Sequence, residues 1–121
     1  MKDLPSREIL DRLEEAYECF QYGFYQACIA MCRSVLEYSL KEQLKASKTP
    51  PRIDYMRQGG DLTALIKQAE EIEILSRGLA IDAHEVRRRG NGVLHRRSAA
   101  TRDLCWDTLQ KMRHILARLY K

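Results

Sequence analysis

The sequence contains few proline and aromatic residues and no long hydrophobic run. Three of the 121 residues are proline, and the aromatic residues make up 7% of the chain. No apolar stretch approaches the roughly 20 residues of a membrane-spanning helix, and the acidic opening MKDLPSREILDRLEE lacks the features of a signal peptide. These absences argue against a membrane or secreted protein and predict a soluble, cytoplasmic one.

The four cysteines form no pattern typical of a disulfide framework or a zinc site. Cys28 and Cys32 lie one helical turn apart and could offer two thiolates to a metal, but no CxxC or HxxxH pattern completes a tetrahedral set. Nothing indicates secretion, and all four lie in apolar stretches that favour helices: Cys19, Cys28, Cys32 and Cys105. We therefore expect reduced thiols in the core, with no metal and no cofactor.

The apolar residues recur with the period of an α-helix, and no stretch alternates as a β-strand does. Residues 24–46 carry two apolar stripes, a pattern typical of the central helix of a bundle. The predicted helices run from Ser6 to Gly23, over 24–46, from Asp61 to Leu75, over 79–89, and from Ser98 or Thr101 to Lys121.

Proline and glycine mark the predicted breaks between these helices. Pro50-Pro51 and Gly59-Gly60 indicate a surface loop over 47–61, Gly78 separates two helices, and Gly90-Asn91-Gly92 ends one. No internal repeat or second hydrophobic unit is present. Residues 1–121 therefore predict a single all-α domain, a small up-and-down bundle of four to five helices.

Arginine is concentrated in the stretch RRRGNGVLHRR, residues 87–97. This stretch holds five arginines and no acidic residue, so the other 110 residues carry a net charge of −1 out of the chain's total of +4. Clustered arginines suit phosphate, because the guanidinium group offers both charge and paired hydrogen bonds. The alternative is a solvated loop whose arginines only keep the protein soluble.

His95 lies within this arginine-rich stretch. A turn at Gly90–Gly92 would bring Arg88 or Arg89, at the end of one helix, close to His95 at the start of the next. An imidazole can take the proton of a ribose 2′-hydroxyl while a guanidinium stabilises the phosphoryl oxygens, which yields a 2′,3′-cyclic phosphate and a 5′-hydroxyl. The pattern indicates metal-independent RNA cleavage; a structural histidine in a turn is the alternative.

Two longer stretches accompany the arginine–histidine spacing. The first is YGFYQACIAMCRSVLEYSL (22–40), and the second is VRRRGNGVLH (86–95). They are similar to a "G-x-Y-x-A … R-x-x-L-E" helix and an "R-x-x-GN-x-x-x-H" turn through these residues: Gly23, Tyr25, Ala27, Arg33, Leu36, Glu37, Gly90, Asn91 and His95. With five or six residues between an arginine and a histidine, the chain resembles the HEPN superfamily (higher eukaryotes and prokaryotes nucleotide-binding), in its branch called domain of unknown function 4145.

The resemblance implies a helical bundle that forms a homodimer and brings two arginine–histidine motifs into one cleft. Many relatives are metal-independent ribonucleases of toxin–antitoxin or phage-defence systems, and others bind nucleic acid or nucleotide without cutting it. The implied partners are RNA or a nucleotide, a second copy of the chain, and an antitoxin or larger defence protein. The implied site has Arg88, Arg89 and His95 as catalytic residues, Arg87, Asn91, Arg96 and Arg97 in contact with nucleic acid, and Arg33 and Glu37 in support.

Three functions remain open at this point: an endoribonuclease, a non-catalytic module that binds RNA, nucleotide or an acidic partner, and a protein-binding oligomerisation domain. Arg33 and Glu37 also fit an ordinary salt bridge along a helix. His84 and His114 are expected on the surface. Trp106 suits either the core or a dimer contact, and we expect it in the core.

Overall fold

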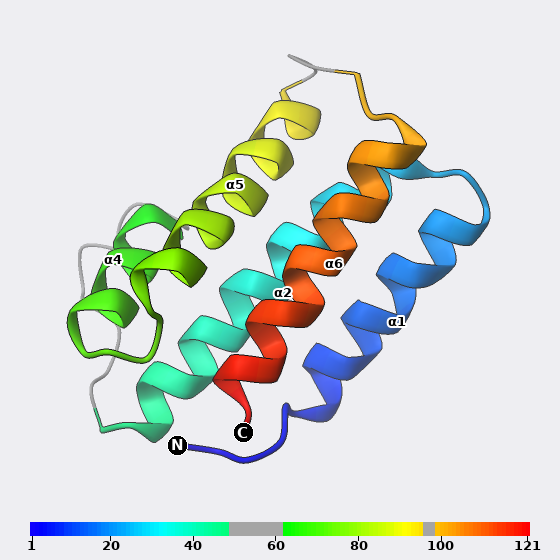
Figure 1. Ribbon diagram of the computed structural model, residues 1–121. Helices are drawn as coiled ribbons and strands as arrows, with labels where there is room; N and C mark the ends of the chain where they lie inside the picture. Colours follow the sequence, from blue (N-terminus) through cyan, green and yellow to red (C-terminus); the bar gives the residue numbers. More distant parts are fainter. Residues whose placement is uncertain (49–61, 96–98) are drawn as a thin grey trace.

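The computed structural model describes residues 1–48, 62–95 and 99–121, which form five packed helices and no strand. The all-α prediction is confirmed (Figure 1). The helices are α1 (Arg7–Gln21), α2 (Tyr25–Ala46), α4 (Leu62–Glu71), α5 (Arg77–Leu94) and α6 (Arg102–Leu119). None of these helices is long and apolar enough to cross a membrane.

Helix α2 lies at the centre of the bundle and packs against each of the other four helices. This confirms the prediction made from its two apolar stripes. Its fully buried residues, such as Ile29 and Leu36, meet buried residues of α6, such as Met112. Helices α1, α2, α5 and α6 alternate in direction, so both chain termini lie at one end of the bundle, opposite the C-terminal end of α5 (Figure 1).

Most helix boundaries agree with the sequence pattern, and side-chain caps explain two of the starts. Oγ1 of Thr101 accepts a hydrogen bond from the Leu104 N–H at 3.1 Å and starts α6; the alternative cap, Ser98, lies outside the described residues, as does Asp61. Oγ of Ser76 accepts from the Leu79 N–H at 3.2 Å and starts α5. Gly78 therefore lies in the first turn of α5 and does not separate two helices.

The preceding helix is shorter than predicted, because α4 ends at Glu71 and not at Leu75. Glu73 then adopts a positive φ of 64°, which turns the chain toward Leu75 in the core. Of the predicted loop over 47–61, Ser47 and Lys48 follow the end of α2, and residues 49–61 lie outside the described part of the chain.

The predicted helix break at Gly90-Asn91-Gly92 is wrong, because α5 continues to Leu94 and is capped by His95. Gly90 faces α2, where a Cβ atom would lie only 2.6 Å from Cβ and Cδ of Arg33. The glycine therefore permits a close approach of two helices; it does not form a turn. Val93, which is buried, fixes the last turn of α5 against the core.

The cysteines are free thiols, as the sequence predicts. Cys28, Cys32 and Cys105 are buried and Cys19 is partly buried. Burial raises the pKa of Cys105 and of Cys19, which keeps both thiols protonated at neutral pH. Among the described residues, no group of three or more His, Cys, Asp or Glu side chains could hold a metal ion.

Candidate functional site

Arg88 and His95 lie on the same solvent-facing side of α5. Seven residues make nearly two turns of an α-helix, so the two side chains leave the helix in almost the same direction, about 10.5 Å apart along its axis. The Arg88 side chain is 56% exposed, and His95 is exposed at the C-terminal cap of the helix. The continuous helix therefore aligns the two residues, and the expected turn between the end of one helix at Arg88 and the start of the next at His95 is wrong.

The backbone of His95 is fixed, and its side chain is exposed. The His95 N–H donates to the Asn91 carbonyl at 3.0 Å, which closes the last turn of α5. Within the described residues, the imidazole forms no hydrogen bond or ion pair. The ring is thus accessible to a ligand.

Arg89 points toward α6 and does not share this face. Its Nη1 donates to Oδ2 of Asp107 at 2.6 Å and to Oγ1 of Thr108 at 3.1 Å, and its side chain is only 17% exposed. The hydrogen bond from Arg89, together with the nearby Lys111 ammonium, lowers the pKa of Asp107 below its usual value. Arg89 therefore joins α5 to α6.

Glu85 lies between the two arginines. One carboxylate oxygen pairs with Arg88 at 2.7 Å and the other with Arg89 at 3.2 Å. The hydrogen bond from Arg88 is the largest influence on Glu85 and lowers its pKa, with a further contribution from the Arg89 charge. Because the Glu85–Arg88 pair is exposed, an incoming phosphate can compete with it for the guanidinium group.

Asn91 and Arg33 connect this face to the central helix. Nε of Arg33 donates to Oδ1 of Asn91 at 2.9 Å, directly beside the close contact with Gly90. Glu37 lies 3.7 Å from Arg33 and 3.4 Å from Lys41, so the salt bridge along α2 is present too. Arg33 therefore contacts α5 at Gly90 and Asn91, and Glu37 pairs with Arg33 along α2.

Arg87 lies on the other flank of α5 and contacts His84. Its Nε donates to Nδ1 of His84 at 3.3 Å, and both side chains are partly buried. Burial is the main cause that lowers the pKa of His84, and the charges of Arg87 and Arg88 lower it further. His84 is therefore partly buried at the surface, and His114 is exposed as expected. Arg96 and Arg97 lie outside the described residues.

The same end of the bundle carries aromatic side chains that the sequence analysis did not assign to the site. Tyr22 and Phe24, in the turn between α1 and α2, are 75% and 63% exposed. Trp106 is 45% exposed and packs on Phe20 with the ring centres 5.2 Å apart, so its placement in the core was wrong. The α1–α2 turn, the end of α5 and the start of α6 all lie at this end of the bundle (Figure 1). In the sequence, the Tyr-Gly-Phe stretch at 22–24 was the signal that could have indicated these exposed aromatic side chains.

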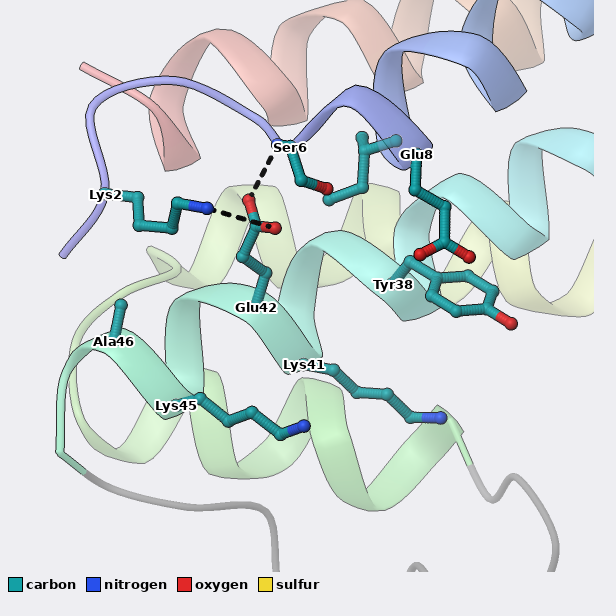
Figure 2. Close-up of a pocket in the computed structure, with 9 residues that line it drawn as sticks. Lys2, Ser6, Glu8, Tyr38, Lys41, Glu42, Lys45 and Ala46 are labelled. Carbon is teal, nitrogen blue, oxygen red and sulfur yellow. Dashed lines mark hydrogen bonds and ion pairs between the residues drawn. The ribbon is translucent and has the colours of Figure 1, made fainter.

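A cavity of about 620 Å³ lies at the opposite end, between the N-terminal segment and α2 (Figure 2). Burial alone would raise the pKa of Glu42, but hydrogen bonds from Ser6 and Tyr120 and the charge of Lys2 lower it overall. These contacts fasten both ends of the chain to α2. None of the residues predicted for the site lines this cavity.

A match to a known protein family covers the whole of this site. A family model described as a domain of unknown function, DUF4145, matches residues 14–121. The match includes α2, α5 and α6, which carry every described residue of the Arg88–His95 face and its support. No curated protein and no solved structure matches the chain.

Proposed function

The chain belongs to the DUF4145 family, and we propose that it is an RNA-binding protein of HEPN type that cleaves RNA without a metal ion, through an arginine–histidine site completed in a homodimer. The observation that carries the proposal is the shared, exposed face of Arg88 and His95 on α5. The resemblance noted above adds a toxin or phage-defence role, with an antitoxin or larger defence protein as a further partner.

The chemistry of this face fits transesterification of RNA. The His95 imidazole takes the proton of a 2′-hydroxyl, the O2′–P bond forms, and the P–O5′ bond breaks. The leaving 5′-oxygen takes a proton from water, which gives a 5′-hydroxyl end beside a 2′,3′-cyclic phosphate. The Arg88 guanidinium stabilises the negative charge that develops on the phosphoryl oxygens.

Both Arg88 and Arg89 have the spacing to His95 that the resemblance requires, and we assign the phosphate contact to Arg88. Arg89 already contacts Asp107, Thr108 and Glu85 and is largely buried. Moving Arg89 to a ligand would break the link between α5 and α6. Arg88 is exposed and shares its direction with His95, so its guanidinium group can reach a phosphate without disturbing the bundle.

A second copy of the chain supplies the other wall of the site. Arg88 and His95 lie on the outside of a helix, and such a surface does not by itself enclose a sugar–phosphate chain. Positioned groups stabilise a developing charge best where water is excluded. Two α5 faces that oppose each other would form a groove with two histidines and two arginines.

The test is incubation of the purified protein with single-stranded RNA in EDTA. We expect fragments with 2′,3′-cyclic phosphate and 5′-hydroxyl ends, and loss of these products in His95→Ala at unchanged thermal stability, because His95 is exposed. His114→Ala, which removes an exposed histidine of α6, is the matched control and retains cleavage. Cleavage that persists in His95→Ala contradicts the proposal.

Glu85 favours a second candidate function, RNA binding without cleavage. Its carboxylate lies between Arg88 and Arg89. The negative charge there neutralises part of the guanidinium charge that would stabilise a transition state. Under this alternative, RNA affinity falls with rising salt and weakens in Arg88→Ala, and no cut product forms. Salt-independent binding would contradict it.

A further inference from the structure

We propose that the turn between α1 and α2 holds one unpaired RNA base by stacking, at the end of the bundle that carries His95. The inference rests on the proposed function and specifies its substrate class as single-stranded RNA. Its basis is a hollow beside exposed aromatic rings, at the end of the bundle where α5 presents His95.

The hollow has a volume of about 440 Å³ and is formed by the start of α2 and the segment before α6. Its lining residues are Gly23, Phe24, Tyr25, Gln26, Ala27 and Ala100. The Phe24 side chain is 63% exposed at its edge, and the neighbouring Tyr22 is 75% exposed. Exposed aromatic rings beside a shallow hollow are the surfaces on which unpaired bases stack.

The backbone holds these rings in a fixed position. The Phe24 N–H donates to the Cys19 carbonyl at 2.8 Å, and the Phe24 carbonyl accepts from the Cys28 N–H at 2.9 Å. Gly23 between the two aromatic residues has a φ of +79°, a conformation that glycine adopts without strain. A base that stacks here meets a turn whose backbone is already ordered, so little backbone entropy is lost on binding.

The register of α2 against α5 places the start of α2 and His95 at similar levels along the bundle axis. Arg33 contacts Asn91, and the two helices run in opposite directions (Figure 1). His95 lies four residues beyond Asn91, about 6 Å along the axis, and Gln26 lies seven residues before Arg33, about 10.5 Å in the same direction. The two levels differ by about 4.5 Å along the axis, so His95 and the hollow at the start of α2 lie at the same end of the bundle, where one RNA strand can extend over both.

The polar groups around the hollow suit a nucleotide better than an apolar protein surface. Gln26 is exposed on its rim, and its amide can both donate to and accept from a base edge. Arg102 at the start of α6 lies 5.2 Å from the centre of the Phe20 ring and adds an exposed positive charge beside the aromatic cluster. Arg88 adds a second exposed positive charge on α5, and both charges match a phosphate backbone.

The experiment measures stacking directly with a short single-stranded RNA that contains 2-aminopurine, whose fluorescence is quenched when it stacks. The protein carries His95→Ala so that the RNA stays intact. We expect Phe24→Ala to weaken binding about 5- to 150-fold and to abolish the quenching, and Phe24→Trp to retain both. Leu10→Ala is the matched control, because Leu10 is 43% exposed in the first turn of α1, at the other end of the bundle.

Three results would overturn the inference: unchanged affinity and quenching in Phe24→Ala, equal binding of the same RNA as a duplex, or a Phe24→Ala variant that loses self-association but not RNA affinity. The last result would assign the rings to an interface between copies. The proposed cleavage is tested separately, because the stacking signal is read in a protein that cannot cut. Quenching without any cleavage by the wild-type protein would contradict the nuclease alone.

Discussion

Nε of Arg33 on α2 donates a hydrogen bond to Oδ1 of Asn91 on α5 at 2.9 Å, across a contact that only glycine at position 90 permits. This pair fixes the rotation of α5 about its own axis. The rotation in turn decides that Arg88 and His95 face solvent while Arg89 faces α6. The geometry of the proposed site therefore depends on this contact between α2 and α5.

The close contact at Gly90 predicts an unusual response to alanine. A Cβ atom there would lie 2.6 Å from Cβ of Arg33, which is fixed to the α2 backbone and cannot swing away. We expect Gly90→Ala to lower the free energy of unfolding by about 1–3 kcal/mol. Gly78→Ala is the control: nothing lies within 4 Å of its Cβ position, and alanine there should stabilise α5 by about 0.5–1 kcal/mol. Urea unfolding measures both, and stabilisation by both variants would refute the packing role of Gly90.

The Arg33–Asn91 hydrogen bond predicts a measurable coupling between the two side chains. A partly buried hydrogen bond with a charged donor contributes about 1.5–3 kcal/mol. We expect a double-mutant cycle of Arg33→Ala and Asn91→Ala, followed by urea unfolding, to give a coupling energy of about 1–2 kcal/mol. Additive effects of the two substitutions would mean that the contact does not stabilise the α2–α5 pair.

The sequence predicts the helical class and the central position of α2 because both follow from the spacing of apolar residues. It does not predict the continuation of α5 through Gly90-Asn91-Gly92. Glycine serves turns and close helix contacts alike, and only the position of Arg33 on another helix distinguishes them. The exposed position of Trp106 was missed for a similar reason, since burial of a large apolar side chain depends on which helix packs beside it.

Neighbouring arginines on α5 should differ in their effects on stability. Arg89→Ala removes the contacts with Asp107 and Thr108 that join α5 to α6, and we expect a loss of about 1–2 kcal/mol after allowing for the half-exposed Asp107. Arg88→Ala removes only an exposed pair with Glu85 and should cost less than about 0.5 kcal/mol. Thermal and urea unfolding of the two variants make the comparison. Equal losses would contradict the separate roles assigned to these arginines.

The lowered pKa of His84 predicts that the free energy of unfolding depends on pH near neutrality. Its pKa in the folded protein is lowered, mainly by burial, so the unfolded chain binds a proton more readily. Stability should therefore fall as the pH drops below about 6.5, the ordinary histidine value, toward 5. The lowered pKa values of Glu85 and Asp107 act at lower pH, because the ordinary pKa of a carboxylate already lies well below that of histidine.

The measurement for His84 is urea unfolding at pH 7 and pH 5 in the wild type and in His84→Gln. Glutamine can still accept the hydrogen bond from Arg87 but does not titrate. The variant should lose less stability over this range than the wild type. An equal loss in both proteins would place the titrating group elsewhere.

The most direct test of the central claim is the single-turnover rate of RNA cleavage in EDTA for the wild type, Arg88→Ala, His95→Ala and the double variant. If both side chains act on one phosphate in one step, each single substitution slows cleavage by about 100-fold or more, and the double variant is about as slow as the slower single one. A wild-type rate in either single variant would contradict a joint site of Arg88 and His95 on α5.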